Sequence, residues 1–116
     1  MSYTQAYQPQ LPEINFSNNW NKKLDNTAFT TIRLENPNKY KIGQQYEIKL
    51  NHKKITVGKI IEIRKLMFKD INEFIAYLDT GYSSTECKKI IQKMYPSIDF
   101  THKFLYLILI KKLNRL

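Results

Sequence analysis

The most restrictive feature of this 116-residue sequence is an uninterrupted apolar run, Phe104–Ile110. Seven residues are far too few for a membrane-spanning helix, which needs about 20 apolar residues. A run of this length is typical of a β-strand that is buried on both faces. We therefore expect this segment to be either the central strand of a sheet or the strand that closes a barrel.

Three more strands are predicted before this run. Phe29–Leu34 consists mainly of β-branched and aromatic residues, which favour strands. In residues 46–50, apolar and charged side chains alternate, and the polar turn at 51–53 predicts a hairpin with a third strand at residues 54–66. Gly58 lies inside that third strand, so we expect a bend or bulge there of the kind that barrels need.

Three short helices are predicted as well. Residues 15–25 place an apolar side chain at every fourth position, which indicates one face of a helix. The capping boxes Asp70-x-x-Glu73 and Ser83-x-x-Glu86 each begin a helix. The apolar stripe of the first of these two helices is Ile71, Phe74, Ile75 and Leu78.

The length fits a single domain, and strands with separate short helices predict an α+β fold: a small β-barrel flanked by short helices, over residues 15–116. Residues 1–14 hold tyrosines and prolines without an apolar period, and we expect an extended N-terminal arm that a protein partner could hold. No signal peptide is recognised, and the single Cys87 can form no internal disulfide. These features predict a cytoplasmic protein, or one inside a virus or ribonucleoprotein particle, without a membrane partner.

The net charge of +9 is concentrated in the predicted strands. Residues 22–69 carry twelve Lys and Arg against four acids, a balance of +8, whereas residues 70–100 carry a balance of −2. A one-sided basic surface suits a polyanion, usually a nucleic acid. The alternative is a coding bias, because sixteen Lys, fifteen Ile and ten Asn are what an AT-rich genome produces. The candidate nucleic-acid contacts are Arg33, Lys39, Lys41, Lys53, Lys54, Lys59 and Arg64.

Two hydroxyls and a guanidinium occupy the strand Phe29-Thr30-Thr31-Ile32-Arg33. They could form a polar cluster in a cleft, with Asp79 as its carboxylate. The alternative is that these are ordinary strand residues and that Asp79 only ends a helix. Isolated histidines and the lone cysteine predict no metal site, and three separated glycines predict no phosphate loop, so no cofactor is expected.

The order of these elements and three short motifs resemble the ASCH domain of the PUA-like superfamily, and most of all its small bacterial acetylcytidine amidohydrolase branch. The motifs are Asn-Thr-Ala-Phe-Thr-Thr-Ile-Arg at 26–33, Ile-Gly-Gln at 42–44 and the segment Lys88–Pro96, which ends in Tyr-Pro. The likeness covers residues 14–112. It implies a PUA-like barrel, a fold that commonly binds RNA.

The resemblance also assigns roles to single positions. The family's catalytic threonine matches Thr31, and its glutamate falls near Thr80, with Asp79 adjacent. Its catalytic lysine falls at Ala28, and alanine can neither transfer a proton nor activate a nucleophile. Thr31 and Asp79 are therefore only weak catalytic candidates.

From these observations we expect a non-catalytic module that binds nucleic acid, RNA before DNA, through a basic cleft. Two alternatives stay open. One is a structural component of a larger particle, such as a phage assembly or a ribonucleoprotein, held through residues 1–14. The other is an amidohydrolase that acts on modified nucleosides, with another group in place of the missing lysine.

Overall fold

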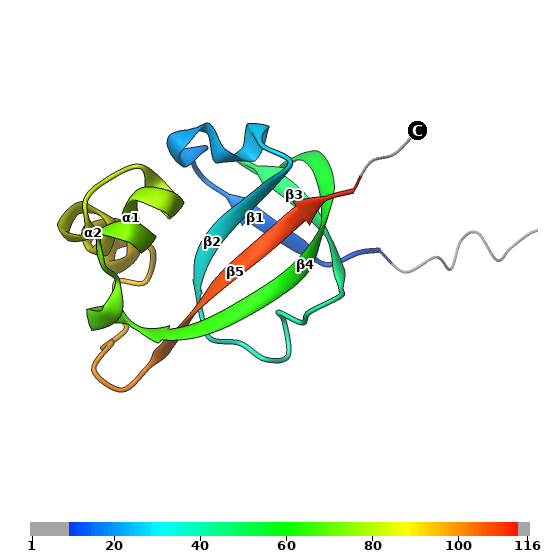
Figure 1. Ribbon diagram of the computed structural model, residues 1–116. Helices are drawn as coiled ribbons and strands as arrows, with labels where there is room; N and C mark the ends of the chain where they lie inside the picture. The colour runs from blue at the N-terminus through cyan, green and yellow to red at the C-terminus, as the bar shows by residue number, and fades with distance from the viewer. Residues whose placement is uncertain (1–9, 114–116) are drawn as a thin grey trace, which may run out of the picture.

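The computed structural model describes residues 10–113 and shows an α+β fold. Five strands form one mixed sheet that curls into a half-barrel, and the helices gather on one side of it (Figure 1). The strands are β1 (Glu13–Phe16), β2 (Ala28–Leu34), β3 (Gln45–Leu50), β4 (Lys53–Met67) and β5 (Phe104–Lys112). The helical segments are the 3₁₀ helices η2 (Trp20–Asp25) and η3 (Phe68–Asp70) and the α-helices α1 (Glu73–Thr80) and α2 (Ser84–Met94).

The apolar run forms β5, which lies inside the sheet between β4 and β2 in the order β1-β3-β4-β5-β2. β5 is antiparallel to both neighbours, and β1 is parallel to β3. The expectation that β5 is buried on both faces is wrong for Leu107 and Leu109. Both side chains are half-buried, because no helix covers them fully, and they line a groove on the outer face of the sheet.

The hairpin between β3 and β4 follows directly from its turn residues. Asn51 and His52 have φ angles of 51° and 68°, and two consecutive positive φ values are what a two-residue hairpin turn of the type I′ kind needs. Asparagine tolerates this left-handed conformation better than most residues. The turn therefore fixes the register in which β4 returns along β3.

The bulge expected at Gly58 lies elsewhere. The pairing of β4 with β5 shifts register between Ile60 and Glu62, and the pairing with β3 shifts between Ile48 and Lys49. Gly58 instead permits close packing, because a Cβ there would lie 2.5 Å from Cγ2 of Ile110. Space, and not backbone conformation, is thus the reason for this glycine.

The chain segment before β2 differs from the predicted helix at residues 15–25. Glu13–Phe16 is a strand that pairs with β3, and only Trp20–Asp25 turns as a 3₁₀ helix. Ile14 is buried in the half-barrel, so the predicted boundary of the arm at residue 14 falls inside β1. Residues 1–9 of the predicted arm lie outside the described part of the chain.

Helix α1 begins at a different cap and buries a different face from the predicted ones. Its N-cap is Asn72, whose side chain accepts a hydrogen bond from the N–H of Ile75, while Asp70 belongs to η3. Phe74 is 76% exposed and Leu78 is 49% exposed. The buried side chains of this helix are instead Ala76, Asp79 and Thr80.

Helix α2 agrees with its prediction. Ser83 caps it by accepting a hydrogen bond from the N–H of Glu86, and Tyr95 follows its last residue. Cys87 and Ile91 are buried in a core cluster between the sheet and the helices, which is separate from the cluster inside the half-barrel. Within residues 10–113, no helix combines the length and the apolar character that crossing a membrane would require.

Candidate functional site

A buried ion pair joins η2 to the C-terminal end of α1. Nζ of Lys23 lies 2.9 Å from Oδ1 of Asp79, and the two side chains are only 5% and 7% exposed. Lysine and aspartate are among the residues least often buried, and a buried pair loses hydration that its attraction only partly returns. An ion pair in such a place is a candidate for function.

Thr30 completes the cluster from β2. Its hydroxyl donates a hydrogen bond of 2.8 Å to the same oxygen, Oδ1 of Asp79. One carboxylate oxygen therefore receives an ammonium group and a hydroxyl that come from two other elements. We call Lys23, Thr30 and Asp79 the polar triad.

Two local features direct Lys23 toward the interior. Asn21 and Lys22 have φ angles of 57° and 53°, and this left-handed kink comes directly before Lys23. Gly81 ends α1 with φ 80°, and a Cβ at that position would lie 3.0 Å from the side chain of Asn21. Left-handed conformations at non-glycine residues are strained by about 1–2 kcal/mol each, and such strain concentrates at functional sites.

Burial shifts the pKa values of two side chains at this site, Lys23 and Cys87. Burial lowers the pKa of Lys23 below its usual value, and the neighbouring Asp79 carboxylate opposes that shift. Behind the triad, burial raises the pKa of the Cys87 thiol, and the negative charge of Asp79 raises it further. Cys87 is therefore a core thiol and no competing nucleophile.

Arg33 and Thr31 lie next to the triad but form a contact of their own. Nε of Arg33 donates to Oγ1 of Thr31 at 2.9 Å, and Nη2 donates to the carbonyl oxygen of Asn15 at 2.9 Å. The guanidinium lies 4.8 Å from the centre of the Phe16 ring. Arg33 thus links β2 to β1, the two outer strands of the sheet.

A small cavity of about 50 Å³ lies among these groups, and its lining includes Lys23, Thr31, Arg33 and Asp79. One water molecule needs at least roughly 10–15 Å³, so the cavity has room for a few waters and for no larger ligand. The structure therefore brings together three of the residues that the sequence singled out, Thr31, Arg33 and Asp79. It adds Lys23, and it places Thr30 rather than Thr31 on the carboxylate.

A much larger groove of about 870 Å³ opens on the other side of the triad. Lys23 lines both hollows, Thr30 lines the groove and Asp79 lines the small cavity, so the triad lies between the two. The apolar lining of the groove comes from α1 and from the outer face of the sheet: Phe74, Tyr77, Leu78, Ala28, Phe29, Leu107 and Leu109.

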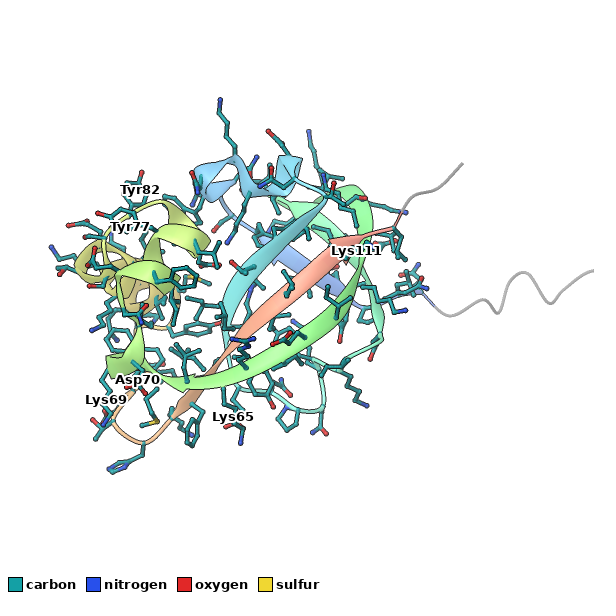
Figure 2. All side chains as sticks on the ribbon, viewed as in Figure 1. Lys65, Lys69, Asp70, Tyr77, Tyr82 and Lys111 are labelled. Atoms are coloured by element: carbon teal, nitrogen blue, oxygen red, sulfur yellow. The ribbon has the colours of Figure 1, made fainter. Side chains whose placement is uncertain are left out.

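The predicted nucleic-acid contacts do not form one cluster. Arg33 points inward, whereas Lys54 and Arg64 lie within 4 Å of Glu47 and Glu62. The remaining four, Lys39, Lys41, Lys53 and Lys59, are exposed. Other basic residues are also spread out, since Lys65 and Lys111 lie toward opposite ends of the β4–β5 ribbon (Figure 2).

Sequence reasoning missed Lys23 because nothing local distinguishes it from fifteen other lysines. Its neighbour Lys22 is exposed, and only the backbone kink in the folded chain makes one lysine buried and the other exposed. The sequence analysis included Thr30 as one of two adjacent threonines, but strand alternation alone does not predict which of the two hydroxyls binds Asp79.

Comparison with known proteins returned no match to any protein-family model, curated protein or solved structure.

Proposed function

We propose that the chain is a small hydrolase that cleaves an amide of a modified nucleoside on an ASCH-like, PUA-like half-barrel. The observation that carries the proposal is the polar triad: a buried lysine and a threonine hydroxyl share one carboxylate oxygen at the end of a groove. We expected no catalysis because the family's lysine position is Ala28. Lys23 supplies an amino group from η2 instead, and this removes the reason for that expectation.

In the proposed reaction, Oγ1 of Thr30 attacks the amide carbonyl carbon while Asp79 accepts the hydroxyl proton. The tetrahedral intermediate expels the amine, which takes a proton from the Lys23 ammonium group. Water then hydrolyses the acyl-threonine ester, which releases the carboxylic acid and restores the Thr30 hydroxyl. Transfer of the proton from Asp79 to Lys23 restores the starting ion pair. The small cavity beside the triad can supply this water.

The test is turnover of N4-acylated cytidines by the purified protein, followed by their ultraviolet absorbance. We expect Lys23→Met, Thr30→Val and Asp79→Asn each to lower the rate by roughly 10²–10⁴-fold. Lys22→Met is the matched control, because Lys22 is the exposed neighbour of Lys23 in the same 3₁₀ helix, and it should keep the wild-type rate. Absence of turnover in the folded wild-type protein, or equal rates for Lys22→Met and Lys23→Met, would contradict the proposal.

A second candidate function, RNA binding by the outer face of the half-barrel, is favoured by one observation. Lys59 on β4 and Lys111 on β5 are register partners, and both are exposed. Two cations side by side on a sheet repel each other unless a polyanion lies across them. The same charges would favour a nucleoside substrate that is part of an RNA strand.

Salt dependence tests this candidate. The log of affinity for a single-stranded RNA should fall linearly with log salt, by about 0.7 per phosphate contact. Lys59→Gln with Lys111→Gln should flatten the slope by about one to two such contacts. Lys88→Gln with Lys89→Gln on α2 is the control and should leave the slope unchanged. Failure to bind RNA at low salt would exclude this function and leave coding bias or a protein partner as the reason for the charge.

A further inference from the structure

We infer that the substrate of the polar triad carries a bulky apolar acyl group, which lies in the groove between α1 and the outer face of β5. This inference rests on the proposed hydrolase function and specifies its substrate class. The groove is far larger than an acetyl group requires, since pockets of roughly 300–1,000 Å³ hold drug-sized ligands, and this one measures about 870 Å³.

The exposed face of α1 supports an apolar occupant. Phe74 is 76% exposed, Tyr77 51% and Leu78 49%, and all three line the groove. Facing them across the groove are Leu107 and Leu109 of β5. Large apolar side chains gathered around one hollow of a water-exposed surface indicate a binding site, because leaving them in water is unfavourable.

The polar side chains of the groove are mostly occupied by partners within the protein. Lys23 and Thr30 bind Asp79, Arg64 binds Glu62, and Glu73 accepts two hydrogen bonds from Ser84. A nucleobase would need hydrogen-bond partners for its edges, whereas an acyl chain needs none. The body of the ligand in this groove is therefore the acyl group.

The position of the triad sets the direction of the ligand. Thr30 and Lys23 both line the groove, and Lys23 also lines the small cavity. A carbonyl carbon held at Oγ1 of Thr30 lets its acyl chain run along Leu107 and Leu109 beneath α1. The amine portion of the substrate then extends toward Asn21 and Asn26, which belong to the same groove and are exposed.

The experiment compares N4-acetylcytidine, N4-hexanoylcytidine and N4-benzoylcytidine as substrates. Each buried methylene is worth up to roughly four-fold in affinity, so we expect kcat/KM to rise at least ten-fold from acetyl to hexanoyl. Phe74→Ser and Leu78→Ser should each return that ratio toward one, because they lower kcat/KM for the hexanoyl substrate more than for the acetyl substrate. Ile42→Ser is the matched control, since Ile42 is 64% exposed and does not line the groove.

A second measurement separates this inference from the hydrolase proposal. Isothermal titration calorimetry of hexanoylcytidine with wild type, Phe74→Ser and Ile42→Ser reports binding whether or not turnover occurs. Binding without turnover that only Phe74→Ser weakens would support the acyl groove and contradict hydrolysis. Equal kcat/KM for acetyl and hexanoyl substrates would overturn the acyl groove and leave the hydrolase. A wild-type dimer in sedimentation velocity that Phe74→Ser dissociates, without acyl binding, would assign the groove to a second copy of the chain and overturn the inference.

Discussion

Helices α1 and α2 have similar apolar patterns in the sequence, yet they meet the sheet in opposite ways. The apolar stripe of α2 consists of Cys87, Ile90, Ile91 and Met94. Cys87 and Ile91 are buried in the core, as this pattern predicts, whereas Met94 is 42% exposed. Helix α1 buries Asp79 and Thr80 and leaves Phe74 and Leu78 in solvent. The buried side of α2 is apolar, whereas the buried side of α1 includes a carboxylate, Asp79, that binds Lys23 and Thr30.

Breaking the ion pair should have the largest effect on stability. Asp79→Ala leaves the Lys23 ammonium buried without a partner, and such a loss destabilises proteins by about 3–5 kcal/mol. Urea denaturation followed by circular dichroism measures this change.

The double variant Lys23→Met with Asp79→Leu tests whether stability is kept when both charges of the ion pair are removed together. Apolar residues of similar size often replace a buried ion pair without loss of stability, and the half-buried Thr30 can bond to water instead. We expect stability close to wild type together with complete loss of turnover. A double variant as unstable as Asp79→Ala would show that α1 depends on the pair for its position and not only for its charge balance.

The apolar sides of the two helices should respond differently to the same kind of change. Ile91→Ala on α2 should lower the free energy of unfolding by about 2–5 kcal/mol, because it leaves a cavity in the core. Phe74→Ala on α1 should stay within about 0.5 kcal/mol of wild type, as exposed positions do. Thermal or urea denaturation of both variants measures these free energies of unfolding. A large loss of stability for Phe74→Ala would show that α1 is packed by its apolar face.

The smallest expected effect is a pH dependence of stability that belongs to Lys23. Burial lowers its pKa in the folded protein, so between that value and the ordinary lysine pKa of about 10.4 the unfolded chain binds more protons. Stability that depends on Lys23 should therefore rise with pH in this window. The measurement is the difference in unfolding free energy between wild type and Lys23→Met from pH 7 to 10.5. A difference that is constant or falls would show that the folded environment favours the charged lysine.

The sequence predicted the strands better than the helices for a physical reason. In β3, buried Tyr46 and Ile48 alternate with charged residues, so period-two alternation records the buried side of the sheet directly, and β5 was recognised from its continuous apolar run. The apolar stripe predicted for α1 is divided, because Ile71 and Ile75 pack in a core cluster whereas Phe74 and Leu78 line the groove. Helical periodicity does not distinguish these two environments. The segment at 13–16 looked helical because Phe16, Trp20 and Leu24 coincide at helical spacing, although Phe16 belongs to β1.

Only some residues of the candidate site could be predicted from the sequence. Thr31, Arg33 and Asp79 could be proposed because polar groups on an apolar strand and at a helix end are unusual. Lys23 could not, because its burial arises from the kink at Asn21 and Lys22, which is a property of the fold. The lysine that reaches the carboxylate comes from η2, a segment outside the strand in which the sequence analysis placed the polar cluster.

The Arg33 contact has a consequence for how the protein behaves in solution. β1 and β2 are the outer strands of an incompletely closed sheet, and strand edges of this kind can recruit other chains into aggregates. The Arg33 side chain holds the Asn15 carbonyl and rests on the Phe16 ring, which places a charged group across the gap between the two edges. Arg33 therefore lies across the open side of the half-barrel, and we expect its replacement by alanine to increase edge-to-edge association.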